Sequence, residues 1–188
     1  MRGRLLLIGA GLLVLSGCGE SAAVTRDDPP LPIPPVVKLP ASAAGGVCVL
    51  LDYPAIEESI GTRFDVSAAT ASGRTNTCVL QSEEASRPDL ALSVTPTTAD
   101  SAVFAGEMPN GGQSVKGLGK SAYRLTLPVG EDHGAGVEVS WLSADGRMIN
   151  LRYTLAAGEG KPAADALAGK LVTLAKAIDA AKPDATKP

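Results

Sequence analysis

Residues 137–153 read VEVSWLSADGRMINLRY, and this stretch decides the fold. Apolar and polar residues alternate on both sides of a turn, which is the pattern of β-strands with one buried face. The apolar positions are Val137, Val139, Trp141, Ile149, Leu151 and Tyr153. The stretch therefore predicts two antiparallel strands whose apolar side chains share one face.

The turn between these strands determines which residues pair. A two-residue loop, Asp145-Gly146, would place Trp141 opposite Asn150 and mix the buried and solvated faces. A three-residue loop, Ala144-Asp145-Gly146 with its glycine left-handed, instead pairs Trp141 with Ile149 and keeps the apolar residues together. We therefore expect the three-residue loop with a bulge.

Shorter alternating runs predict four more strands outside this hairpin. They are centred on Phe64 and Val66, on Cys78 and Leu80, on Leu90, Leu92 and Val94, and on Tyr123, Leu125 and Leu127. Connections of hairpin length join several of these runs, which favours antiparallel pairing over a parallel nucleotide-binding sheet.

Two short helices are expected before and between the strands. The first has Asp52 as its N-cap, carries Ile56 and Ile60 inward and ends at Gly61. The second spans residues 98–107. Its expected inner side is formed by Ala102, Val103 and Phe104.

A third helix is expected from Pro162 to about Ala181, with a narrow apolar stripe. The stripe consists of Leu167, Leu171, Leu174 and Ile178. A sheet with one apolar face needs a cover, so the stripe is interpreted as core and not as a partner site. The sequence thus predicts an α+β fold, in which a mostly antiparallel sheet of about six strands is covered by a C-terminal helix and two short helices.

Length and charge exclude several classes of protein. The chain has 188 residues, a net charge of -3, one histidine and three cysteines. This length fits one compact domain beside a sorting segment. The low histidine count argues against a multi-histidine metal site, and the acidic balance argues against nucleic-acid binding through a basic surface.

The N-terminal residues have the layout of an export signal. Arg2 and Arg4 precede an apolar run, Leu5 to Leu15, that is too short to span a bilayer, which takes ~20 residues. Glycines within the run argue against the alternative, a buried helix. The run ends in Leu-Ser-Gly-Cys, which is similar to the lipobox of bacterial lipoproteins. The resemblance implies that residues 1–17 are removed and that Cys18 is acylated. We expect a lipid-anchored protein on the outward, extracytoplasmic side of the cell membrane.

Residues 18–44 are rich in proline and are expected to form a disordered tether, followed by a folded domain over 45–181 and a disordered tail over 182–188. A proline-rich ligand for a partner domain is the alternative function of the tether. With Cys18 assigned to the lipid, Cys48 and Cys78 remain, and an exported protein permits a disulfide between them. The alternative, a two-cysteine redox site, lacks the short C-x-x-C spacing.

Several segments together resemble small actinobacterial, mycobacterial-type cell-envelope lipoproteins that carry a domain of unknown function. These are Cys48-Val49-Leu50-Leu51 with a helix ending at Gly61, Thr77-Cys78-Val79, the segment Val115 to Tyr123 and the C-terminal Leu/Ala helix. The usual acidic residue after Gly-Leu-Gly in that group is Lys120 here. The resemblance implies an anchored, exported module and supplies no catalytic residues.

The motifs that suggest chemistry have simpler interpretations. The Gly-Lys-Ser at 119–121 imitates a phosphate loop, but Ser114 stands where the first glycine belongs. Glu131-Asp132-His133 groups the single histidine with two carboxylates, yet adjacent residues cannot easily converge on one ion. No Gly-x-Ser-x-Gly elbow occurs. We therefore expect no catalytic set, no metal and no cofactor.

The predicted function is a non-enzymatic binding module for an envelope lipid, a glycan or a protein partner. The groove between the loop 111–120 and the sheet is the first candidate site. Its candidate ligand-binding residues are Lys116, Lys120, Tyr123 and Arg124. The alternatives are an envelope hydrolase with an unrecognised serine or carboxylate pair, and a purely structural scaffold for a membrane protein. The oligomeric state is left open.

Overall fold

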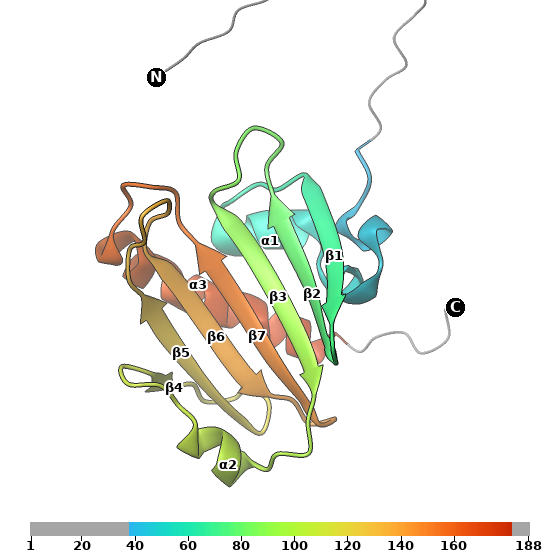
Figure 1. Ribbon diagram of the computed structural model, residues 1–188, viewed down its shortest axis with the longest axis vertical. Helices are drawn as coiled ribbons and strands as arrows, with labels where there is room; N and C mark the ends of the chain where they lie inside the picture. The colour runs from blue at the N-terminus through green and yellow to red at the C-terminus, as the bar shows by residue number, and fades with distance from the viewer. Residues whose placement is uncertain (1–37, 182–188) are drawn as a thin grey trace, which may run out of the picture. The chain divides into compact units, whose positions relative to one another are not determined.

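The computed structural model describes residues 38–181 (Figure 1). The predicted signal segment, Cys18, the residues of the predicted tether up to 37 and the tail 182–188 lie outside the described residues. In chain order the elements are η1 (Ala41–Ala44), η2 (Gly46–Leu50), α1 (Tyr53–Ile60), β1 (Val66–Ser72), β2 (Thr75–Gln81), β3 (Asp89–Pro96), α2 (Ser101–Gly106), β4 (Gln113–Ser114), β5 (Ser121–Leu127), β6 (Gly136–Leu142), β7 (Arg147–Thr154) and α3 (Lys161–Ala180).

The strands form one sheet with the order β1-β2-β3-β7-β6-β5-β4, and every neighbouring pair is antiparallel. The predicted α+β class is confirmed. Over residues 38–181 the sheet has seven strands rather than about six. The added strand, β4, has two residues and pairs with β5 inside a segment predicted as loop. Two residues are too few to carry a periodic signal, so the sequence pattern missed it.

The predicted hairpin register is confirmed. Trp141 lies opposite Ile149, and Val139 lies opposite Leu151. Gly146 has a φ of 80°, and the Ser143 amide donates to the Arg147 carbonyl oxygen at 2.8 Å to close the turn. The alternating residues on either side of the turn therefore reach the same face of the sheet.

Most of the helices pack on one face of the sheet. Figure 1 shows α1 and α3 behind the strands, and α2 at the lower end of the sheet. The helix α3 covers β5, β6 and β7, while η2 lies against β1, β2 and β3. Of the predicted stripe on α3, Leu171, Leu174 and Ile178 are buried and Leu167 is partly buried. Buried alanines widen the stripe, and they are Ala164, Ala168 and Ala175.

The first helix follows its prediction. Asp52 accepts a hydrogen bond from the Ala55 amide at 3.2 Å, and Gly61 ends the helix with a φ of 79°. The strand after it begins less regularly, because the Asp65 amide donates to the Gln81 carbonyl oxygen while Val66 also pairs with Gln81. This breaks the expected alternation, so Val66 is 40% exposed although Phe64 is buried.

The second short helix is smaller than predicted. It spans Ser101–Gly106 with Asp100 as its N-cap. Only Phe104 is buried, and it stacks on Tyr123 of β5 with ring centroids 5.7 Å apart. The expected inner positions of Ala102 and Val103 are wrong, because so short a helix presents a single side chain to the sheet.

The predicted disulfide is confirmed. Cys48 of η2 is bonded to Cys78 of β2, and both residues are fully buried.

Folded structure also begins before residue 45, the expected start of the domain. Ala41 of η1 is 1% exposed, and its carbonyl oxygen accepts a hydrogen bond from the Ser67 hydroxyl at 3.3 Å. This packing against β1 places residues 41–44 in the folded part.

Candidate functional site

The Gly-Leu-Gly-Lys-Ser segment, 117–121, has a packing role. Leu118 is 2% exposed and enters the core. Gly119 has a φ of 53°, and a Cβ placed there would lie 2.3 Å from the Leu142 carbonyl oxygen. That oxygen accepts a hydrogen bond from the Lys120 amide at 2.7 Å. The strand β5 follows directly, so no helix N-terminus faces a phosphate here.

The same segment is held by the end of α3. The Asp179 carboxylate accepts the indole N–H of Trp141 at 2.8 Å through Oδ1 and the Gly119 amide at 3.2 Å through Oδ2. Trp141 is fully buried, so its indole N–H needs an internal acceptor. Asp179 therefore joins the loop, the sheet and α3.

The four ligand-binding candidates lie in different surroundings. Lys116 and Lys120 are exposed on the loop. Tyr123 and Arg124 are consecutive in β5, so their side chains point to opposite faces of the sheet. Tyr123 packs under α2, whereas Arg124 lies on the face that α3 covers, opposite Val139. Of the four candidates, only Arg124 lines the cleft that opens on that side.

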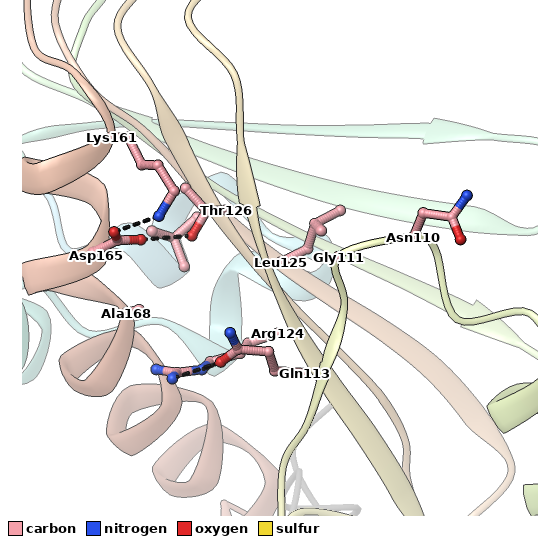
Figure 2. Close-up of a pocket in the computed structure, with 10 residues that line it drawn as sticks. Asn110, Gly111, Gln113, Arg124, Leu125, Thr126, Lys161, Asp165 and Ala168 are labelled. Atoms are coloured by element: carbon pink, nitrogen blue, oxygen red, sulfur yellow. Dashed lines mark hydrogen bonds and ion pairs between the residues drawn. The ribbon is translucent and has the colours of Figure 1, made fainter.

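This cleft, called the β5 cleft below, has a volume of about 400 Å³. It opens between β5, the loop before β4 and the first turns of α3 (Figure 2). Its lining consists of Asn110, Gly111, Gln113, Arg124, Leu125, Thr126, Val137, Lys161, Asp165 and Ala168. Most of these side chains are polar or charged.

Two hydrogen-bonded groups organise the polar wall of the β5 cleft. The Arg124 guanidinium donates to Gln113 Oε1 through Nε at 3.1 Å and Nη2 at 2.8 Å. Asp165 accepts from Thr126 Oγ1 at 3.0 Å and from Lys161 Nζ at 2.5 Å. The hydrogen bond from Lys161, helped by that from Thr126, lowers the pKa of Asp165. The carboxylate is therefore ionised at neutral pH, and the cleft carries two cations against one anion.

Sequence reasoning found Arg124 and missed the other polar residues of the cleft. Lys161 and Asp165 stand four residues apart, which is a recognisable ion-pair spacing in a helix, but Lys161 lies one residue before the predicted helix start at Pro162. Thr126 and Asp165 are 39 residues apart, and no local pattern links them. Gln113 lies in β4, the strand too short to predict.

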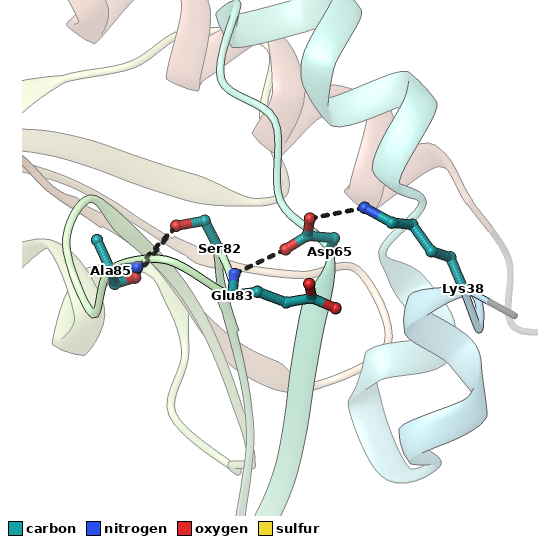
Figure 3. Close-up of polar contacts among 5 residues, drawn as sticks. All are labelled: Lys38, Asp65, Ser82, Glu83 and Ala85. Atoms are coloured by element: carbon teal, nitrogen blue, oxygen red, sulfur yellow. Dashed lines mark hydrogen bonds and ion pairs between the residues drawn. The ribbon is translucent and has the colours of Figure 1, made fainter. Parts of the chain in front are cut away.

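A second hollow lies near the start of β1 and is called the Asp65 hollow (Figure 3). It has a volume of about 370 Å³ and is lined by Lys38, Arg63, Asp65, Ser82, Glu83 and Glu84. Asp65 accepts hydrogen bonds from Lys38 Nζ at 3.0 Å and from the Glu83 amide at 2.9 Å. These bonds, first that from Lys38, lower the pKa of Asp65. Asp65 thereby joins the first described residue to the β2–β3 loop.

The histidine cluster forms part of the β5–β6 loop. Glu131 and Asp132 are exposed, and His133 Nδ1 lies 2.6 Å from the Gly134 carbonyl oxygen. Over residues 38–181, no group of three or more histidine, cysteine or acidic side chains is arranged to hold a metal ion. Within the same range, no helix has both the length and the apolar character needed to cross a bilayer.

Comparison with known proteins gives no relative: no protein-family model, curated protein or solved structure matches this chain.

Proposed function

We propose that this chain is an exported, lipid-anchored cell-envelope lipoprotein whose folded domain binds a polar envelope glycan in the β5 cleft. The anchor rests on the charged start, the short apolar run and the lipobox-like ending at Cys18. The choice of a glycan as the ligand is inferred from the size and chemistry of the β5 cleft. Its volume of about 400 Å³ falls within the usual range of small-ligand sites, roughly 300–1,000 Å³.

The observation that carries this proposal is the chemistry of the cleft wall. Gln113 engages two N–H groups of Arg124, and a guanidinium has five to donate. The remaining donors suit hydroxyl and carboxylate oxygens of a sugar. A lipid carrier needs an apolar cavity instead, and the apolar side chains of α3 and the sheet are packed against one another in the core. Of the three ligand classes considered, the wall favours a glycan bearing acidic groups.

The test is a titration of the purified chain with a glucuronate-containing oligosaccharide and with its uncharged counterpart, followed by NMR. We expect Arg124→Gln to weaken binding of the acidic sugar by about tenfold or more, because a hydrogen bond to a charged group contributes roughly 1.5–3 kcal/mol. Lys116→Gln, which changes an exposed loop lysine outside the cleft, is the matched control. Equal affinities for wild type and Arg124→Gln would reject the β5 cleft as the site.

A hydrolase is the second candidate function, and the Asp65 hollow is the observation that favours it. Asp65 and the pair Glu83 and Glu84 come together there from two segments. Because the pKa of Asp65 is lowered, this carboxylate would act as a nucleophile or stabiliser of positive charge rather than as a general acid. The same incubations, analysed for shortened oligosaccharides, test this candidate. Release that stops in Asp65→Asn but persists in Arg124→Gln would favour the hydrolase over the binding module.

A further inference from the structure

The strand β1 is an open edge of the sheet. It pairs with β2 on one side, and no described residue forms a strand on its other side. Six of its seven residues are exposed. The short helices η1 and η2 pack beside the strand, where the Ser67 hydroxyl donates to the Ala41 carbonyl oxygen and Gly46 lies next to Ala69. Its outer row of backbone N–H and C=O groups is therefore a template for another strand.

Apart from the irregular pairing of Asp65 and Val66 with Gln81 at its start, β1 contains none of the usual devices that block such pairing. It reads VSAATAS, without a charged residue, proline or glycine. Natural edge strands are commonly protected by lysine, proline, a bulge or a very short length. The opposite edge of this sheet follows that rule, because β4 has only two residues. The two edges of the sheet thus differ in how well they are protected against the addition of another strand.

We propose that β1 pairs antiparallel with β1 of a second copy of this chain, about a two-fold axis at Ala69. An antiparallel strand pair is self-complementary, so one patch supplies both sides of the interface. The small serine, alanine and threonine side chains put little bulk between the two edges. The result is one continuous sheet through two domains.

The positions of charged residues favour a second copy of this chain as the partner and antiparallel pairing of the two β1 strands. Asp65 and the Asp65 hollow lie at the start of β1, and Arg74 lies just after its end. In the antiparallel arrangement about Ala69, Arg74 of each copy falls opposite Phe64 of the other, one residue from Asp65, whose carboxylate also accepts hydrogen bonds from Lys38 and the Glu83 amide. Arg74 is exposed and forms no ion pair within residues 38–181. The preceding segment of this chain is a poor occupant of the edge, because prolines 29, 30, 32, 34 and 35 have no N–H to donate to a ladder.

Sedimentation equilibrium of the full mature chain tests the proposal, in density-matched detergent if the chain carries lipid. We expect the wild type to dimerise. Thr70→Lys places like charges across the two-fold axis and should raise the dimer dissociation constant by about tenfold or more. Arg74→Glu should act in the same direction. Thr98→Lys, an exposed threonine before α2, adds the same charge elsewhere and should leave the constant unchanged.

Hydrogen exchange identifies the surface that dimerises. Amides of β1 should become better protected as the protein concentration rises, and this change should be absent in Thr70→Lys. Unchanged circular dichroism and unfolding midpoint show that the variant is folded. A wild type that stays monomeric at millimolar concentration would overturn the proposal, as would a dimer that Thr70→Lys leaves intact. A monomer whose β1 amides are protected only by an added extended peptide would also overturn it, because the edge would then serve another protein.

Discussion

Gly119 illustrates how one residue type can serve either a ligand or the packing of a loop. Its φ of 53° lies in the left-handed region, and the space beside its Cα is filled by the Leu142 carbonyl group. A glycine here is required by backbone conformation and by close approach at once. The phosphate-loop appearance of the segment follows from these two needs.

We predict that Gly119→Ala lowers the free energy of unfolding by more than about 2 kcal/mol, because the new Cβ would clash with backbone that cannot move freely. Gly73→Ala is the matched control. Gly73 has a similar φ of 58°, and no atom lies within 4 Å of the place its Cβ would take, so only the backbone cost remains, roughly 1 kcal/mol. Urea unfolding measures both values. Equal losses in the two variants would contradict the packing role of Gly119.

Asp65 should make stability depend on pH in the acid range. Its pKa is lowered in the folded state, whereas an unfolded aspartate titrates near pH ~4. The ionised form therefore stabilises the fold above about pH 4, and this contribution is lost as the pH falls through the lower folded-state pKa. We predict a shallower acid slope of the unfolding free energy in Asp65→Asn than in wild type. The difference is small, because the ion pair with Lys38 is exposed.

Lys38→Gln provides the comparison for this prediction. It should also flatten the acid slope, and combining it with Asp65→Asn should add little, since both changes remove the same interaction. Additive effects of the two substitutions on the slope would show that Lys38 does not stabilise the ionised form of Asp65.

At the scale of elements, Asp179 controls how the end of α3 meets the sheet. Asp179→Ala would leave the buried Trp141 N–H without its acceptor. We predict a loss of about 1–3 kcal/mol in unfolding free energy, the usual cost of an unsatisfied buried polar group. The protein has one tryptophan, so its fluorescence follows unfolding directly. Asp179→Asn keeps one acceptor oxygen and should lose less, and an equal loss would show that the acceptor is not what matters.

Helices and strands could be predicted from the sequence where the apolar pattern is long and the residues of the turn or cap are specific. The hairpin 137–153 has both, so its register followed from the positions of Trp141 and Gly146. The first helix had a clear cap at Asp52 and a clear stop at Gly61. The strand β4 has no period, and the burial of α2 depends on its contact with Tyr123, which is distant in sequence.

At the scale of the whole molecule, the candidate site depends on tertiary placement. The β5 cleft forms because α3 lies across β5, which brings Asp165 to Thr126. The predicted groove includes both Tyr123 and Arg124, which are consecutive in β5 and therefore point to opposite faces of the sheet. A site made by two elements can be located only after their packing is known.

The proposed lipid anchor has its own test. If Cys18 is acylated as proposed, we predict that Cys18→Ala removes the acyl groups, because the thiol proposed to carry the first lipid is lost. The variant should show no diacylglycerol mass and should leave the membrane fraction or stay unprocessed. Mass spectrometry of membrane and soluble fractions measures both. Retention in the membrane without an acyl mass would reject lipidation as the means of attachment.

The disulfide also determines how the domain responds to a pull from its N-terminal side. Traction on Lys38 meets the exposed ion pair with Asp65 first, and then the short helices η1 and η2. Unfolding under this pull then stops at Cys48, because its disulfide transmits the force to Cys78 in β2. This strand is paired on both sides. Only the residues before Cys48 can be extended by the pull. Tension in the segment that precedes the domain therefore does not unfold the main sheet.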